Sequence, residues 1–163
     1  MLIGILSDTH DEIRRTELAV DVLRSAGAEL LVHCGDIVKP DVVRSCSILP
    51  LHFVFGNHDS DMVRELEAIA LETGANCLGW GGEIVAAGKR IGVVHGHLTT
   101  DLQPILDECP DYLLSGHSHA THDFQAGKTR RINPGALHRA EDYTVATLDV
   151  ASDKLQFHSI RPA

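Results

Sequence analysis

Histidines, aspartates and one asparagine occur in five short clusters, and each cluster directly follows an apolar run. In chain order the clusters are Asp8/His10, Asp36, Asn57/His58, His95/His97 and His117/His119. Histidine is the commonest metal ligand and titrates near neutral pH, and the chain contains 11 histidines. Imidazole, carboxylate and amide ligands without a thiolate suit Mn, Fe, Zn, Ni or Co better than a soft metal.

The spacing of these residues would allow two metal ions. Asp8 and His10 are two residues apart, as are His117 and His119, so each pair can share one face at the end of a strand. Asp36 stands alone in its loop and is the natural bridge between two ions. Two ions about 3.5–4 Å apart can clamp both oxygens of an in-line displacement and supply hydroxide at neutral pH. Such a centre would attract a phosphate ester.

The apolar runs before the clusters are predicted strands. In the first half they alternate with helical patterns: strands over residues 2–6, 30–33 and 51–55, and helices over residues 14–26, 40–48 and 61–73. This alternation predicts a parallel sheet, whose strands end at one common edge. Ligands bind beyond such strand ends, so we expect the clusters to converge there.

The second half of the chain is richer in hairpins. It predicts a helix over residues 101–108, a turn at Asn133-Pro134-Gly135, and strands over residues 83–87, 90–94, 112–115, 122–125, 129–132, 143–150 and 154–160. We therefore expect a four-layer α/β sandwich of two mixed β-sheets flanked by helices. No linker or repeat interrupts the chain, so residues 1–163 are expected to form a single domain.

Composition narrows the class of function. Hydrophobic residues make up 44% and charged residues 23%, as in globular proteins. The net charge of −9 argues against a protein that coats nucleic acid or an anionic membrane. The first ten residues have no basic start and contain Asp8, so we expect no signal peptide and a cytoplasmic location. The four cysteines form no CxxC pair and are expected to be reduced thiols.

In their order, the clusters resemble the motifs of the calcineurin-like metallophosphoesterases. The matching segments are Asp8-x-His10, Gly35-Asp36, Gly56-Asn57-His58-Asp59, His95-Gly96-His97 and Gly116-His117-x-His119. The lack of insertions and the ending Asn133-Pro134-Gly135 resemble the small bacterial and archaeal phosphodiesterase branch. Each motif alone is weak, whereas five in order at strand ends are specific. The resemblance implies the metallo-dependent phosphatase fold over nearly the whole chain.

The resemblance also implies a role for each residue. One metal would bind Asp8, His10, Asp36 and His119, and the other would bind Asp36, Asn57, His95 and His117. His58 would contact the phosphate, and it would stabilise charge or protonate the leaving oxygen. His97 would ligate the first metal or lie against it. Asp36 and His58 are thus the expected catalytic residues, and Asn57, His58 and His97 are the expected substrate contacts.

The implied activity is that of a metal-dependent phosphodiesterase acting on a small phosphodiester. The expected cofactor is two divalent ions, with manganese first and Fe, Ni, Zn or Co as alternatives. A hydroxide that bridges the two ions would attack the phosphate diester in line. No membrane is expected as a partner, nor nucleic acid in bulk. A homodimer is the commonest oligomeric state for such a chain.

Two positions depart from the family pattern. Asp11 stands where a glycine usually follows the motif histidine, and it could cap the first helix or repel anionic substrates at the pocket mouth. Ala136 stands where a serine usually follows Asn-Pro-Gly. If that serine holds substrate in relatives, the contact is missing here.

Several other polar residues are expected to be structural. Asp59 is expected to cap the helix over residues 61–73. Five histidines match no ligand position: His33, His52, His122, His138 and His158. Of these, His122 and His138 could line the rim of the pocket. Trp80 could be an exposed loop aromatic or a contact between subunits, and the sequence does not decide between them.

Two other functions fit the same motifs. Phosphomonoesterases and protein phosphatases of this fold are usually longer and carry an arginine in the active-site loops, where this chain has Asn57-His58-Asp59. A non-catalytic scaffold resembling the retromer subunit would have asparagine and phenylalanine at the positions of Asp36 and His58. The chain keeps both residues, which favours an enzyme.

Overall fold

The first half of the chain builds most of a six-stranded sheet and the three helices beside it. The structure is a computed structural model and describes residues 1–161. Its elements in this half are β1 (Leu2–Leu6), α1 (Ile13–Ser25), β2 (Leu30–His33), α2 (Pro40–Cys46), β3 (Leu51–Phe53), the 3-10 helix η1 (Asn57–Met62), α3 (Val63–Thr73) and β4 (Asn76–Cys77). Strands β10 (Thr144–Asp149) and β11 (Lys154–Ser159) complete the sheet, in the order β11-β10-β1-β2-β3-β4. The strands from β1 to β4 are parallel, whereas β10 and β11 pair antiparallel.

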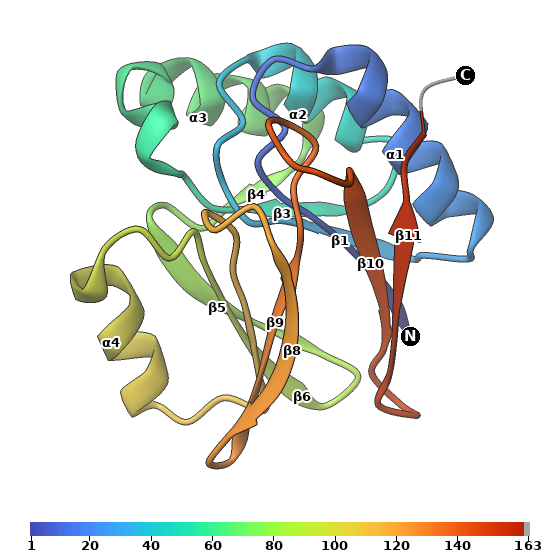
Figure 1. Cartoon of the computed structure of the whole chain (residues 1–163). Coiled ribbons are helices and arrows are strands. Elements are labelled where there is room, and N and C mark those ends of the chain that lie inside the picture. Colours follow the sequence, from blue (N-terminus) through green and yellow to red (C-terminus); the bar gives the residue numbers. More distant parts are fainter. Residues whose placement is uncertain (162–163) are drawn as a thin grey trace.

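The remaining elements form a five-stranded sheet with one helix beside it. They are β5 (Gly81–Ala86), β6 (Lys89–Val94), α4 (Thr99–Asp107), β7 (Tyr112–Leu114), β8 (Thr121–Ala126) and β9 (Thr129–Pro134). The strand order is β5-β6-β7-β9-β8, with β6, β7 and β9 parallel and the two outer strands antiparallel. Figure 1 shows α1, α2 and α3 over the first sheet and α4 on the outer side of the second. The expected four-layer α/β sandwich of two mixed sheets is confirmed.

Two apolar layers hold the sandwich together, and β1 contributes to both. Ile3 and Ile5 pack with residues of the second sheet, whereas Leu6 packs with the helices. All three side chains are fully buried. Since successive side chains of a strand point to opposite faces, a strand buried on both faces must be apolar throughout. This explains why β1 is a continuous apolar run rather than an alternating one.

The predicted turn at Asn133-Pro134-Gly135 is present as an Asx-turn at the end of β9, and the strand itself continues through Pro134. The buried Asn133 side chain also has a partner outside this turn. Its amide donates to the Gly116 carbonyl over 2.7 Å, and its carbonyl accepts from the Gly135 N–H over 2.9 Å. The sequence also missed β4 and η1, which are too short to show a hydrophobic period.

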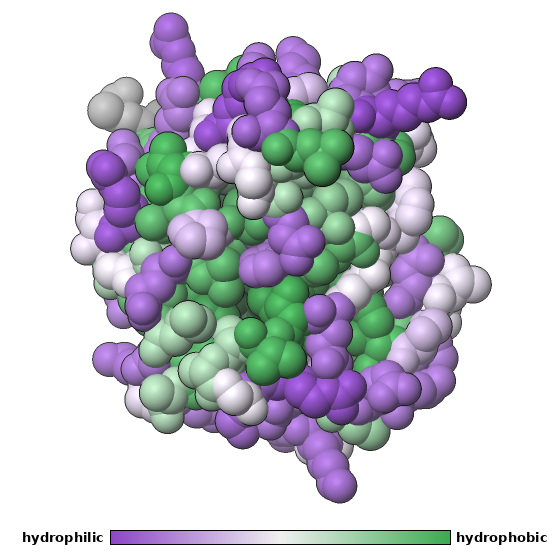
Figure 2. All heavy atoms as spheres, turned by 180° about the vertical axis from the view of Figure 1, so that it is seen from behind, coloured by the Kyte–Doolittle hydropathy of each residue, from purple (hydrophilic) through white to green (hydrophobic). Residues whose placement is uncertain are grey.

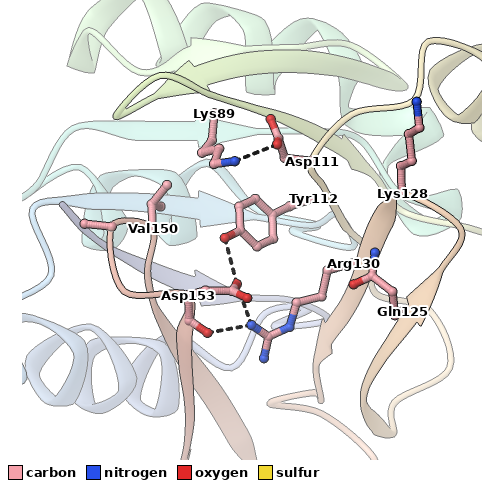
Figure 3. A pocket seen from close by; sticks show the side chains of 9 residues that line it. Lys89, Asp111, Tyr112, Gln125, Lys128, Arg130, Val150 and Asp153 are labelled. Carbon is pink, nitrogen blue, oxygen red and sulfur yellow. Dashed lines mark hydrogen bonds and ion pairs between the residues drawn. The ribbon is translucent and has the colours of Figure 1, made fainter.

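A network of ion pairs joins the two sheets at the amino ends of β6, β7 and β9 (Figure 3). Lys89 pairs with Asp111 over 2.9 Å, and Arg130 pairs with Asp153 over 2.6 Å. The Tyr112 hydroxyl donates to the same Asp153 carboxylate over 2.8 Å. These residues line a cavity of about 260 Å³ on the edge opposite the predicted clusters. The pairing of its charges favours a structural role.

The surface of the back face is partly apolar. Figure 2 shows apolar side chains gathered in the middle of this view, broken by charged ones. Across the molecule, the large hydrophobic residues with high exposure include Ile48, Leu71 and Val85. Exposed apolar surface is typical of protein contacts, and the homodimer stays a prediction. Within residues 1–161, none of the helices has the length and apolar character needed to span a bilayer.

His33 is a buried histidine at the end of β2, and its side chain connects the loops that follow β1 and β2. Its side chain is only 1% exposed. Nδ1 accepts a hydrogen bond from the Gly35 N–H over 3.2 Å, so Nε2 carries the proton and donates to the Thr9 hydroxyl over 3.0 Å. Burial, and next the charge of nearby His95, lower the pKa of His33 to about 3. The ring is therefore neutral in the folded protein.

We expect His33 to make the folded state sensitive to acid. Its pKa is about 3 when folded and near 6.5 when unfolded, so the unfolded chain binds the proton first and stability falls as pH drops from 6.5 toward 3. The loss approaches at most about 1.4 kcal/mol per pH unit for one proton. Urea denaturation of chelator-treated protein between pH 7 and pH 4.5 should show a shallower pH slope for His33→Gln than for wild type. The control His158→Gln, on the edge strand β11, should keep most of the slope; equal slopes for wild type and His33→Gln would contradict the prediction.

Candidate metal centre

All five predicted clusters meet at the carboxyl ends of the parallel strands. Asp8 and His10 follow β1, Asp36 follows β2, and residues 57–58, 95–97 and 117–119 follow β3, β6 and β7. The rings of His10 and His119, from different sheets, have centroids 6.1 Å apart. His95 follows β6 of the second sheet, and its Nδ1 donates a hydrogen bond to the carbonyl of Cys34 in the first sheet over 2.8 Å. The candidate site therefore lies where the ends of the two sheets face each other.

The Asp8 carboxylate is fully buried, and its two oxygens have different surroundings. Oδ2 accepts hydrogen bonds from the Ser7 hydroxyl over 2.6 Å and from the His117 N–H over 3.1 Å. Oδ1 lies 3.1 Å from His119 Nε2 and 4.0 Å from His95 Nε2. The structure thus anchors one oxygen and turns the other toward two histidines.

Asp36 repeats this arrangement on the neighbouring strand. Its Oδ1 accepts from the His58 N–H over 2.9 Å. Its Oδ2 lies 3.4 Å from His95 Nε2 and 3.7 Å from His10 Nε2. Asp36 Oδ2 therefore sits between a histidine from the first sheet and a histidine from the second.

Hydrogen bonds also orient His95 within the cluster. Because Nδ1 donates to the Cys34 carbonyl, Nε2 is the nitrogen that faces the two aspartates and lies 3.1 Å from Asn57 Oδ1. Metal-binding histidines usually donate their other ring N–H to such an acceptor. The neighbouring His117 ring has its centroid 5.1 Å from that of His95.

The backbone is strained at most of the predicted ligands. Five of them have a left-handed backbone, with φ of 50° at Asp8, 48° at His10, 57° at Asp36, 67° at His117 and 57° at His119. Such conformations cost roughly 1–3 kcal/mol each and cluster at functional sites. Hydrogen bonds hold two of them in place: the Asp8 N–H donates to the Gly35 carbonyl over 3.0 Å, and the His10 N–H to the Asp36 carbonyl over 2.9 Å.

Two motif glycines are required because the carboxylates approach them closely. A Cβ atom on Gly116 would overlap Ser7 Oγ and crowd Asp8 Oδ2. A Cβ atom on Gly56 would overlap the Asp36 carboxylate and its backbone nitrogen. The glycines that precede Asn57 and His117 therefore make room for the anchored aspartate oxygens.

Asp59 has a role that the sequence interpretation missed, and the prediction that it caps α3 is wrong. Its buried carboxylate accepts hydrogen bonds from the N–H groups of Gly56 over 2.7 Å, Ile37 over 2.9 Å and Val38 over 2.6 Å. Helix α3 instead begins after Met62, without a side-chain cap. Asp59 thus ties the loop that follows β2 to the loop that follows β3. The three-residue spacing from Gly56 to Asp59, typical of a capping box, was the available signal.

Charge is distributed unevenly within the cluster. Burial lowers the pKa of His10 to about 4, so this ring is neutral at pH 7. Burial would raise the pKa of Asp36, but the hydrogen bond and charge of His95 and the His58 N–H outweigh it and lower that pKa to about 2. For His95, the two aspartates likewise outweigh burial and raise the pKa. The two carboxylates therefore favour the protonated form of His95, whose Nε2 lies 3.4 Å from Asp36 Oδ2.

The donor atoms fit a bound metal. Two groups of three residues bring their ligand atoms within 4.8 Å of one another, namely Asp8/His10/His119 and Asp8/Asp36/His95. Asp8 Oδ1 and His10 Nε2 are buried and make no well-directed hydrogen bond within residues 1–161, although His119 Nε2 lies 3.1 Å from Asp8 Oδ1. An unpartnered buried polar atom costs about 1–3 kcal/mol. Coordination of a cation would remove this cost for both atoms.

Other predicted residues lie around these two groups. The exposed His58 ring has its centroid 5.0 Å from that of His10, at the mouth of the cluster. His97 belongs to neither group; its ring lies 5.4 Å from that of His95 and 6.1 Å from that of Trp80. His138 stacks 4.3 Å from His10, as expected for a rim residue, whereas His122 lies on β8 beside Phe124.

The contacts of Asp11 and Ala136, the two residues that depart from the family pattern, are structural. The Asp11 carboxylate pairs with Lys39 over 3.0 Å. Helix α1 begins after Glu12 without a side-chain cap, so Asp11 neither caps it nor presents an unpaired charge. Ala136 is fully buried and bridges to Tyr143.

Comparison with known proteins gives consistent matches over most of the chain. Residues 1–153 match the model of the calcineurin-like phosphoesterase superfamily domain. A probable metallophosphoesterase from Methanothermobacter thermautotrophicus is 30% identical, over 99% of this chain and 92% of its own. A phosphodiesterase from Methanocaldococcus jannaschii is 26% identical over 83% of each chain. The solved structure of an archaeal phosphodiesterase has the same fold, with a TM-score of 0.87 at 22% identity over 98% of this chain and 99% of that one.

The close approach at Gly116 predicts that Gly116→Ala weakens metal binding. The added methyl group would push Ser7 and Asp8 away, so we expect Mn²⁺ affinity to fall by about tenfold or more in calorimetric titration. Gly88→Ala is the control for a strained glycine substitution far from the site, because Gly88 has a left-handed backbone (φ 77°) but no neighbour near its Cβ position, and it should keep wild-type Mn²⁺ affinity. Ser7→Ala removes only one hydrogen bond and should weaken binding less. A folded Gly116→Ala protein with wild-type affinity would show that this approach does not position Asp8.

Proposed function

The chain belongs to the calcineurin-like phosphoesterase superfamily and is a phosphoric ester hydrolase, and we propose that it is a phosphodiesterase with two metal ions. The observation that carries the proposal is the placement of Asp36 Oδ2, which lies within 3.7 Å of His10 and within 3.4 Å of His95. One oxygen thus faces ligands from both sheets, as a bridge between two ions requires. The M. jannaschii relative named a phosphodiesterase supports the choice of a diester.

Two sets of residues would hold the ions. The first set is Asp8, His10, Asp36 and His119, and the second is Asp36, Asn57, His95 and His117. The buried Asp8 Oδ1, which lies 3.1 Å from His119 Nε2, supports the first set, and the 3.1 Å separation between His95 Nε2 and Asn57 Oδ1 supports the second. When bound, two divalent ions, with manganese proposed first, would lower the pKa of the attacking water and neutralise charge on the phosphate.

His58 would act on the substrate rather than on the metals. Its backbone N–H is anchored by Asp36 Oδ1, so the position of its ring is coupled to the metal centre. The ring is exposed at the mouth of the site, beside His10. There it can donate a hydrogen bond to a phosphoryl oxygen or a proton to the leaving oxygen, while the attacking water approaches in line from the opposite side.

Two cations near the centre are already paired, which leaves them less able to neutralise the second charge of a monoester. Lys39 is paired with Asp11 over 3.0 Å, and Arg15 with Glu12 over 3.5 Å. Arg15 also donates to the Leu137 carbonyl. The positive charges of Lys39 and Arg15 are therefore already balanced by neighbouring carboxylates. A diester carries one negative charge near neutral pH, whereas a monoester carries close to two, so the diester makes the smaller demand on the site.

The proposal predicts metal-dependent turnover of a diester. Chelator-treated protein supplied with Mn²⁺ should hydrolyse bis-p-nitrophenyl phosphate faster than p-nitrophenyl phosphate. Asp36→Asn should lower diester turnover by more than about 100-fold, because one ligand of both ions is changed. The matched control Asp21→Asn, at an exposed surface pair in α1, should keep wild-type rates. Full activity of Asp36→Asn with two ions bound would contradict the bridge, and a preference for the monoester would contradict the diesterase.

A separate prediction concerns His58. His58→Ala should bind Mn²⁺ with wild-type stoichiometry and lose roughly 100-fold or more in kcat, since a positioned proton donor contributes about that factor. The loss should be smaller for a p-nitrophenyl leaving group than for an alkyl one if His58 protonates the leaving oxygen. His158→Ala serves as the control for loss of a histidine. An unchanged kcat would remove His58 from the mechanism.

A further inference from the structure

A pocket of about 310 Å³ opens directly beside the candidate metal centre. The residues that line it are Asn57, Ser60, Trp80, His97, Leu98 and Asp101. Asn57 and His97 belong to the motif clusters, whereas the other four are outside the metal site. The pocket is therefore continuous with the place where the phosphate would bind. Its volume lies at the lower end of the roughly 300–1,000 Å³ typical of small-molecule sites.

Trp80 forms one wall of this pocket. Hydrogen bonds hold its loop in place, and its side chain is partly exposed. Backbone hydrogen bonds secure its loop: the Phe55 N–H donates to the Gly79 carbonyl over 2.7 Å, and the Leu78 N–H to the Phe53 carbonyl over 2.8 Å. The indole packs edge-on against the Phe55 ring at 5.4 Å, yet Trp80 stays 39% exposed. A planar group can therefore stack on the indole without rearrangement of the loop.

The lining of the pocket also includes an acceptor without a hydrogen-bond partner. Asp101 lies in the first turn of α4, which has no side-chain cap. Its Oδ2 atom is buried and has no hydrogen-bond partner within residues 1–161. His97 Nδ1, also in the lining, is in the same state. A carboxylate oxygen only accepts hydrogen bonds, so a ligand group with an N–H donor complements Asp101.

The charge of the pocket excludes a second phosphate. Among residues 1–161, neither lysine nor arginine lines it, whereas Asp101 does. A polyanionic chain would also be repelled by the net charge of −9. The complementary group is uncharged, planar and aromatic, and it has N–H donors on its edge. A nucleobase has all of these properties.

We propose that this Trp80 pocket binds the base of a nucleotide diester, with the base stacked on Trp80 and an N–H edge donating to Asp101. Guanine fits best, because its N1–H and N2–H donors lie side by side and match a carboxylate. The inference rests on the proposed phosphodiesterase function and names its substrate class. It also gives Trp80 a role in binding substrate.

The test compares two diesters that share one leaving group. Guanosine 5′-(p-nitrophenyl) phosphate carries a base, and methyl p-nitrophenyl phosphate does not. Wild type should prefer the guanosine diester by at least about tenfold in kcat/KM, since stacking on an aromatic side chain is typically worth that factor. Trp80→Ala should abolish the preference, Trp80→Phe should keep part of it, and Asp101→Asn should reduce it. Phe124→Ala, an exposed aromatic on β8, is the matched control and should keep the full preference.

A binding measurement provides a readout that does not depend on turnover. Trp80 is the only tryptophan of the chain, so intrinsic fluorescence reports on the pocket directly. Guanosine 5′-monophosphate should quench this fluorescence in the Mn²⁺-loaded protein at concentrations where methyl phosphate does not. Asp101→Asn should shift the quenching curve to higher nucleotide concentration.

The outcomes separate this inference from the proposed function. Hydrolysis of both diesters at equal efficiency, with no selective quenching, would overturn the base-binding pocket and leave the phosphodiesterase intact. An equal loss on both diesters in Trp80→Ala would also overturn it, because the indole would then support the centre and not the base. Failure of wild type to hydrolyse either diester with metals bound would instead overturn the proposed function.

Discussion

The site depends on the different contacts made by the two carboxylate oxygens of each buried aspartate. In Asp8 and in Asp36, one oxygen accepts a backbone N–H from a neighbouring loop, and the other faces histidines. The anchored oxygens need close contact with the loops that follow β7 and β3, which is why Gly116 and Gly56 have no room for a side chain. The same loops hold a left-handed backbone at five of the predicted ligands. The motif residues are scattered along the sequence, but in the structure their positions depend on one another through these contacts.

The site also depends on the way the two sheets meet. His95 comes from the second sheet, but its ring is oriented by the Cys34 carbonyl of the first. The apolar layer between the sheets, with Ile5 and Val93 among its fully buried members, sets the separation of the two strand edges. A change in that layer would move one half of the ligands relative to the other. The ion pairs at the far edge, such as Arg130 with Asp153, restrain the same pair of sheets from the opposite end.

The proposed base pocket lies beside the candidate metal centre, but the two are built mainly from different residues. The proposed metal ligands come from the motif clusters, whereas the proposed base pocket is built mainly from the loop before β5 and the start of α4. Asn57 and His97 join the two regions. His97 lies 5.4 Å from the ring of His95 and 6.1 Å from that of Trp80, so it borders both the metal centre and the pocket. The loops of the second sheet can therefore change the substrate while the metal centre stays the same.

The sequence by itself determined the sandwich fold and the convergence of the clusters, because strand patterns are local and parallel strands end at a common edge. It did not determine what tertiary contacts decide. Asp59 reads as a helix cap from its neighbours, yet its partners Ile37 and Val38 lie more than 20 residues away. Asn133 forms the local turn that the sequence predicts, but its amide also donates to the Gly116 carbonyl on another strand connection, which the sequence does not show. Trp80 had no motif at all, and only the packing of its loop beside His97 and Asp101 places it at the site. Side chains whose partners are distant in sequence leave no local pattern, so the structure alone assigns them.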